Sequence, residues 1–195
     1  MINLVERAKK LLISPRQEWA VINGETHTVT GLYTQYVMIL AAIPAIASFI
    51  GFSFIGYTGY DKPIRIDVGP GLASMVLNYV LGLGAVYVIA LVIDSLAPNF
   101  GGEKDFMQAL KVAAFFPTAS WLAGVFYLIP ALYILGLVGS LYSLYLLMTG
   151  LEPLMKVPED KSIAYTAVVV IVAIVLMVVI SALAALVIPS RSRGF

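Results

Sequence analysis

The chain offers few side chains with which an enzyme could act. His27 is the only histidine and cysteine is absent, so the sequence can build neither a zinc site of histidine and cysteine ligands nor a catalytic centre that needs several histidines. It contains no GxxxxGK[ST] phosphate-binding loop and no HExxH pair. Paired carboxylates occur only in the polar segments between apolar runs. We therefore expect no enzymatic activity, no cofactor and no metal ion.

Two ionisable side chains lie within or beside long apolar runs. Asp94 is near the end of the second run, and Lys111 is near the start of the third. An ionisable group at membrane depth is a candidate site for a proton or an ion. Both residues are shallow, however, and consecutive antiparallel helices would bring their matching ends together. We expect Asp94 and Lys111 to form an ion pair, with a proton or ion site at Asp94 as the alternative.

The composition decides which elements carry these residues. Hydrophobic residues make up 61% of the chain and charged residues 12%, whereas a soluble domain has about 45–50% and about 25%. The chain is therefore an integral membrane protein, and its fold class is an all-α bundle, because helices satisfy their own backbone hydrogen bonds in lipid. A net charge of +1 leaves no basic face for a nucleic-acid partner.

Five apolar stretches are each long enough to cross a bilayer as a helix of about 20 residues. The run from 112 to 151 contains no charge and is about twice that length, so it must hold two spans, with Pro130 at the turn between them. Pro44 should kink the first span, because it removes one backbone hydrogen bond. We expect an N-terminal segment at 1–30, a transmembrane domain at 31–190 and a tail at 191–195, with spans at about 32–55, 70–96, 106–128, 131–149 and 163–188.

The N-terminal segment has the pattern of short helices at a membrane surface. Residues 3–13 place apolar side chains on one face and charged ones on the other, and Ser14 and Pro15 are typical of the start of a second helix. One interpretation is an interfacial anchor, with basic side chains at anionic headgroups and a tryptophan at headgroup depth. The other is a helix packed under the loops of the bundle. The candidate anchor residues are Arg7, Lys9, Lys10 and Trp19.

The distribution of lysine and arginine favours one orientation. With the N-terminus in the cytoplasm, the cytoplasmic segments hold eight of these residues and the opposite segments hold four. Cytoplasmic segments of membrane proteins carry an excess of both residues. We therefore expect the N-terminus to be cytoplasmic and, because five spans separate them, the C-terminus to lie on the opposite side.

The segment from 139 to 162 joins a tyrosine-bearing helix to a charged turn. Tyr142 and Tyr145 are three positions apart and share a helical face, which suits either a groove for a lipid or partner helix or, as we favour, packing across the bundle. The turn that follows combines prolines with charges of both signs. We expect a docking surface for partners here, with candidate residues Tyr142, Tyr145, Glu152, Pro153, Lys156 and Pro158.

Four stretches of the chain have a recognisable order and spacing: NLVERAKKLLISPRQEW, GLYTQYVMILAAIP, FGGEKDFMQALKVAAFFPTASWLAG and LYSLYLLMTGLEPLMKVPEDKS. Together they resemble the bacterial branch of the Yip (Ypt-interacting protein) family of five-pass membrane proteins. The resemblance implies a five-helix bundle in the inner (plasma) membrane with a cytoplasmic N-terminus. Eukaryotic relatives act in vesicle traffic and associate with small GTPases. The segment before the first span is much shorter here, so we do not expect GTPase recruitment.

These observations favour a nonenzymatic organiser or adaptor for other membrane proteins or lipids. The alternative is a small permease or channel subunit, with Asp94 in its polar pathway and with helices broken at Pro44 and Pro117. A five-helix monomer leaves little room for such a pathway. An intramembrane enzyme comes third, because the required side chains are missing. We expect membrane lipids and other membrane proteins as partners, and small residues four positions apart, as at Ala41 and Ala45, leave a homo-oligomer open.

Overall fold

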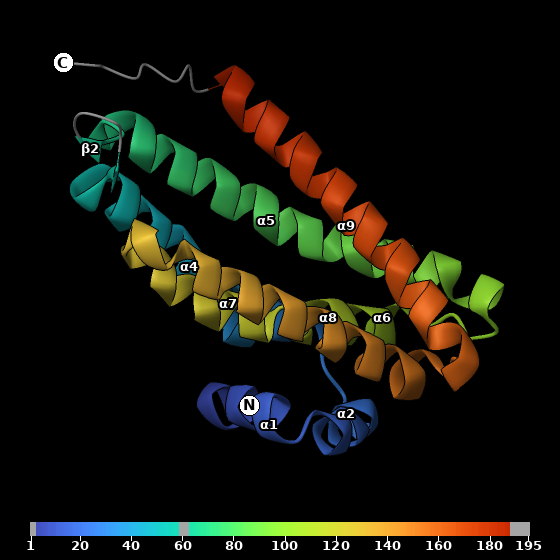
Figure 1. The fold of residues 1–195 in the computed structure, drawn as a ribbon. Helices are drawn as coiled ribbons and strands as arrows, with labels where there is room; N and C mark the ends of the chain where they lie inside the picture. Colours follow the sequence, from blue (N-terminus) through green and yellow to red (C-terminus); the bar gives the residue numbers. More distant parts are fainter. Residues whose placement is uncertain (1–2, 59–62, 188–195) are drawn as a thin grey trace.

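The structure is a computed structural model that describes residues 3–58 and 63–187. Five helical spans make up most of the protein (Figure 1). Each is long and apolar enough to cross a membrane, so the predicted all-α bundle of five spans is confirmed. The predicted tail at 191–195 and the end of the predicted fifth span at 188 lie outside the described residues. The spans are Val29–Ile55, Val68–Phe100, Phe106–Leu128, Pro130–Met155 and Glu159–Leu183.

The first span is not one regular α-helix. Pro44 lies inside it, as expected, and two π-helical turns flank the segment that contains this proline. The ring of Pro44 packs against Gly124 of the third span, where a Cβ would lie 2.5 Å from the Cβ of Pro44. A glycine is therefore needed for the two spans to touch. The span consists of α3, a π-helical turn, α4 and a second π-helical turn, at Val29–Leu32, Tyr33–Val37, Met38–Ile50 and Gly51–Ile55.

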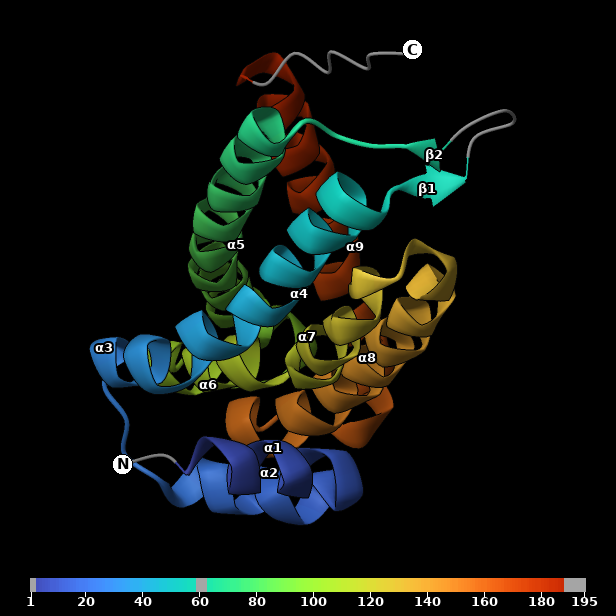
Figure 2. The ribbon, with the colours of Figure 1, turned by 90° about the vertical axis from the view of Figure 1, so that its left-hand side faces the viewer.

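A short β-hairpin links the first span to the second. β1 (Tyr57–Thr58) pairs in antiparallel fashion with β2 (Pro63–Ile64). The second span begins immediately after the hairpin with the long helix α5 (Val68–Leu96), and a 3-10 turn at Ala97–Phe100 completes it. Figure 2 shows the hairpin at the end of the bundle farthest from the N-terminal helices, and we call this the hairpin end.

The third span is the one that the others surround. Its first helix, α6 (Phe106–Phe115), is buried at every position from 109 to 115. The side chain of Asp105 accepts a hydrogen bond from the backbone N–H of Gln108 at 3.0 Å, so the predicted helix start is confirmed. Pro117 interrupts the span, which continues as α7 (Thr118–Ala123) and a 3-10 turn. About 61% of its most apolar stretch is buried, against 11–22% for the other four spans, so α6 and α7 form the core of the bundle.

The fourth and fifth spans are longer than the sequence indicates. A 3-10 turn at 130–132 leads into α8 (Tyr133–Met155), and α9 (Glu159–Val187) follows after three residues, whereas we expected a loop from 151 to 161. Gly150 and Pro153 disfavour a helix locally, but burial of the apolar residues around them outweighs that preference. Lys156 ends α8 in the left-handed conformation, with φ of 54°.

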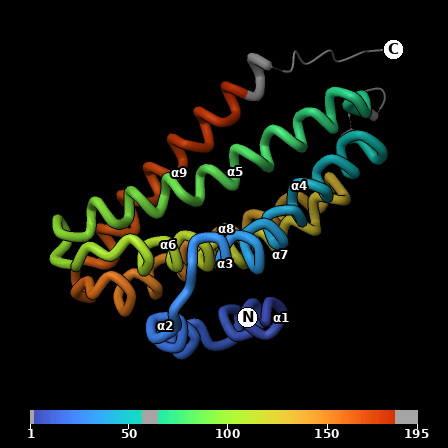
Figure 3. Tube along the Cα trace, turned by 180° about the vertical axis from the view of Figure 1, so that it is seen from behind, coloured from blue at the N-terminus to red at the C-terminus, as the bar shows by residue number. Residues whose placement is uncertain are grey.

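Two short helices precede the spans. α1 (Leu4–Ile13) is followed by α2 (Pro15–Gly24), which begins at the proline as predicted. Figures 1 and 3 show both helices on one side of the bundle and α5 and α9 on the other, with α6, α7 and α8 between them. Figure 2 shows them packed beneath α6 and α8. We call α1 and α2 together the platform, and we call the end of the bundle opposite the hairpin, where α5 meets α6 and α8 meets α9, the platform end.

Candidate docking site at the platform end

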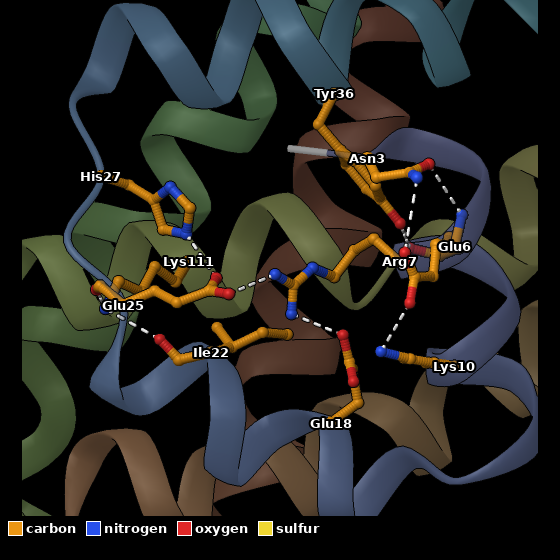
Figure 4. A network of polar contacts seen from close by, with 11 residues as sticks. Asn3, Glu6, Arg7, Lys10, Glu18, Ile22, Glu25, His27, Tyr36 and Lys111 are labelled. Atoms are coloured by element: carbon orange, nitrogen blue, oxygen red, sulfur yellow. Dashed lines mark hydrogen bonds and ion pairs between the residues drawn. The ribbon is translucent and has the colours of Figure 1, made fainter. Parts of the chain in front are cut away.

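The platform is held together by an arginine from α1. The guanidinium of Arg7 donates one hydrogen bond to Glu18 in α2 and one to Glu25 just after it, each at 2.5 Å (Figure 4). The ring of His27 lies 2.9 Å from the other oxygen of Glu25. The side chains of Arg7 and Glu18 are 10% and 7% exposed, so this pair is largely shielded from water. The guanidinium also lies 5.8 Å from the ring centre of Phe115 in α6.

The charge of Glu25 is stabilised by these partners. Burial alone would raise the pKa of its carboxyl, but hydrogen bonds from Arg7 and His27 and the charge of the guanidinium outweigh that effect. The pKa of Glu25 therefore lies below its ordinary value of 4.5. The carboxylate of Glu25 is therefore charged at neutral pH.

Lys111 joins the platform to the core of the bundle. From α6, its ammonium donates hydrogen bonds to the backbone carbonyls of Ile22 at 3.0 Å and Glu25 at 2.5 Å (Figure 4). It also reaches the side-chain carbonyl of Gln108 at 3.2 Å. These backbone carbonyls are those left free at the C-terminal end of α2, where a positive charge is favourable. Lys111 thus joins α6 of the third span to the end of α2 in the platform.

The pairing that we predicted between Lys111 and Asp94 is absent from the described residues. The ammonium of Lys111 instead contacts backbone carbonyls at and just after the end of α2 and the side chain of Gln108. Asp94 instead has one buried carboxylate oxygen, Oδ1, with no hydrogen-bond partner in the described part of the chain. Its neighbour Ile93 accepts a hydrogen bond from the hydroxyl of Tyr165 in α9, and that ring stacks on Phe100 at 4.7 Å. Asp94 is therefore half-buried beside the contact between α5 and α9.

Trp19 belongs to the core rather than to a headgroup layer. Its side chain is fully buried and meets the ring of Phe115 edge to face, with ring centres 6.4 Å apart. On its other side lies Gly150 of α8, where a Cβ would be 2.7 Å from the indole. Phe115 in turn contacts Tyr36 of the first span at 4.6 Å. Arg7 and Trp19 are therefore packing residues of the platform, in agreement with the second interpretation of the N-terminal segment.

The outer face of the platform keeps part of the predicted anchor. Lys9 and Lys10 are exposed, although Lys10 forms an ion pair with Glu6 at 2.8 Å one helical turn away. Exposed apolar side chains lie on the same helix, including Val5 and Ile13. Basic and apolar side chains together are what a helix needs to lie in a headgroup layer. The outer face of α1, and not the buried Trp19 of α2, therefore has the composition of an interfacial anchor.

The two tyrosines of α8 have different roles. The hydroxyl of Tyr142 donates a 2.7 Å hydrogen bond to the backbone carbonyl of Leu12, at the C-terminal end of α1. Its ring lies 5.6 Å from that of Tyr145. Tyr142 thus serves packing within the chain, as we favoured, whereas Tyr145 keeps 38% of its surface exposed.

The charged turn that we predicted as a docking surface is joined to a second turn. The backbone N–H of Glu103, between α5 and α6, donates to the carbonyl of Met155 at 2.9 Å, and the carboxylate of Glu103 pairs with Lys156 at 2.6 Å. Pro158 lies beside Gly101 in the same place. We call the residues 101–105 and 156–158 the turn pair. No sequence pattern predicts the contact between them, because contacts between distant turns leave no periodic signal.

The remaining predicted residues of this surface support the turn pair from within the helices. Glu152 accepts a 3.0 Å hydrogen bond from the hydroxyl of Ser162, which ties the end of α8 to the start of α9. Pro153 lies inside α8. Exposed charges of both signs surround the turn pair, at Glu103, Lys104, Asp105, Lys156, Glu159, Asp160 and Lys161. Within residues 3–58 and 63–187, no group of three or more histidine, aspartate or glutamate side chains is placed to hold a metal ion.

The fold and this site define a five-span helical membrane protein with a surface platform at one end of its bundle. The chain matches the Yip1 domain over residues 9–180 and therefore belongs to the Yip1 family, which confirms the resemblance noted in its sequence. Two relatives, from two strains of Escherichia coli, are both called inner membrane protein YohC. Each is 31% identical over 161 residues, which cover 80% of this chain and 83% of the relative. No solved structure is significantly similar to the chain.

Proposed function

We propose that this protein is a nonenzymatic organiser of the inner membrane, which docks other membrane proteins at its platform end. The observation that carries the proposal is the turn pair, because two turns far apart in sequence are fastened into one rigid surface with exposed charges of both signs. A rigid surface loses little conformational entropy when a partner binds. The exposed lysines and apolar side chains of α1 supply a second contact, with anionic headgroups.

The orientation that goes with this role has a cytoplasmic platform. Support comes from the excess of lysine and arginine on the segments at this end. The chain has no cysteine, so single cysteines report orientation directly. We expect Lys156→Cys to react with a membrane-impermeant maleimide only after the cytoplasmic side is opened, and Arg65→Cys to react in intact cells. The reverse result at both positions would show the opposite orientation and would contradict a cytoplasmic docking surface.

Photo-crosslinking in native membranes tests the docking itself. A photoreactive amino acid at Pro158 or Lys161 should give discrete adducts with defined membrane proteins, whereas the same amino acid at Ile66, exposed at the hairpin end, should not. An adduct with a second copy of the chain would identify the partner as a homo-oligomer. Equal adducts from all three positions would contradict a docking surface.

The unpartnered carboxylate oxygen of Asp94 favours the second candidate, a small permease or channel subunit. Purified protein in liposomes separates the two functions. We expect no flux of protons or of monovalent cations above that of empty liposomes, and no change with Asp94→Asn. A flux that Asp94→Asn abolishes would establish transport in place of the organiser.

A further inference from the structure

A groove lies between α4 and α5 toward the hairpin end, away from the platform. Its cavity volume is about 400 Å³. Among the described residues no lining side chain carries a charge, yet several have a hydroxyl or amide group, which is unusual for a surface that faces lipid. The residues that the argument uses are Ser48, Ser53, Gly71, Asn78 and Gly82, with Trp121 at the base.

Ser53 gives the groove an unmet hydrogen-bonding group. The residue is 7% exposed, and its Oγ has no partner within the described part of the chain. It lies against Gly71, where a Cβ would be 2.5 Å from this oxygen, so the start of α5 holds it in place. The hydroxyl of Ser48 and the amide of Asn78, unlike the hydroxyl of Ser53, each donate a hydrogen bond to a backbone carbonyl of their own helix. A buried hydroxyl without a partner is unfavourable, so a ligand that accepts its hydrogen bond would be stabilised here.

The size of the groove suits a single hydrocarbon chain better than a helix. Gly71 and Gly82 are eleven positions apart on α5, a rise of about 16 Å. A helix about 10–12 Å across would fill roughly 1,300 Å³ or more over this length, which is several times the volume of the groove. A single hydrocarbon chain is narrow enough to fit.

The depth of the groove matches one leaflet. A length of about 16 Å is close to half of the hydrocarbon thickness of about 30 Å. Ser53 lies in the last turn of the first span, which ends at Ile55, so its hydroxyl is at the level where hydrocarbon meets the polar interface. The ester carbonyls of phospholipids lie at this level.

We propose that this groove is a binding site for one phospholipid of the leaflet at the hairpin end. One acyl chain lies between α4 and α5, and its ester carbonyl accepts a hydrogen bond from Ser53. The headgroup lies outside the groove, because the lining has no charge to meet a phosphate. This inference does not depend on the docking role, since the groove and the turn pair are at opposite ends of the bundle.

Two glycines of α5 provide a matched test. A Cβ at Gly82 or at Gly84 would have no heavy atom within 4 Å, so both sites accept a larger side chain, but only Gly82 lines the groove. The purified protein is reconstituted in vesicles of phosphatidylethanolamine and phosphatidylglycerol that contain a trace of phospholipid with a photoactivatable acyl chain. Labelled peptides are identified by mass spectrometry, with unlabelled phospholipid as competitor.

We expect saturable labelling of the peptides that line the groove. Gly82→Leu should lower this labelling at least about fivefold, whereas Gly84→Leu should leave it within about twofold of the natural protein. Ser53→Ala keeps the volume and removes one hydrogen bond, so competitor affinity should fall about three- to tenfold. Should Gly82→Leu fail to fold, Ser53→Ala decides the question alone.

Three results would overturn the proposal. The first is labelling spread evenly over the exposed faces of α5 and α9 without saturation, which indicates bulk lipid only. The second is an equal loss of labelling in both leucine variants. The third is unchanged competitor affinity in Ser53→Ala.

Discussion

Replacement of Arg7 by methionine should loosen α1 from α2 within the platform. Arg7 and Glu18 are each at most 10% exposed, and removal of one member of such a buried pair costs about 3–5 kcal/mol, because the other charge is left unpaired. The contact with Glu25, whose side chain is 31% exposed, adds at most about 1 kcal/mol. A loss of about 3 kcal/mol raises the fraction of molecules in which α1 is undocked on the order of 100-fold.

Hydrogen exchange followed by mass spectrometry measures that fraction. In Arg7→Met, amides of α1 should exchange on the order of 100-fold faster than in the natural protein, while those of α6 change little. Lys9→Met is the matched control, since Lys9 is exposed on the same helix, and its effect should stay within about 0.5 kcal/mol. The double variant Arg7→Met with Glu18→Met should recover most of the protection, because neither charge is then buried alone. If Arg7→Met and Lys9→Met exchange at the same rate, the ion pairs do not hold the platform.

Three further predictions concern the platform end. Gly150→Ala places a Cβ against the indole of Trp19, so thermal stability should fall by about 1–3 kcal/mol, whereas Gly84→Ala, in open space, should not lower it. Because the folded-state pKa of Glu25 lies below its ordinary value of 4.5, its contribution is complete above that pH and is lost as pH falls through the lower value. The opened fraction of α1 and α2, taken from exchange rates corrected for the intrinsic slowing of amide exchange in acid, should therefore be larger at pH 3.5 than at pH 7. Lys156→Gly relieves a left-handed conformation worth about 1–2 kcal/mol and loses an exposed ion pair worth at most about 1 kcal/mol, so it should unfold at a higher temperature than Lys156→Ala.

The sequence is informative wherever a signal is local. Long uncharged runs are sufficient to predict five spans, because no other structure satisfies the backbone in lipid. The start of α6 at Asp105 and the break at Pro117 follow from the chemistry of single residues. The same local reasoning ended the fourth span too early, because Gly150 and Pro153 are poor helix residues and their burial cannot be known from their neighbours in sequence.

The site is harder to predict, because its contacts join residues far apart in the chain. Lys111 was placed correctly at the end of a span, but its partners are backbone carbonyls of α2, which no side-chain pattern reveals. Trp19 has the residue type of an interfacial anchor, and only the contact with Gly150 shows that it is enclosed. A glycine within an apolar helix was the available signal, since a large side chain elsewhere has to fill the space that it leaves.

The packing of Trp19 imposes an order on biosynthesis. Its neighbours are Phe115 in α6 and Gly150 in α8, and the carbonyl of Leu12 at the end of α1 accepts a hydrogen bond from Tyr142 in α8. The first 24 residues leave the ribosome before any of these partners exists. The platform can therefore complete its contacts only after the fourth span has been inserted, so its docking comes late in the assembly of the bundle.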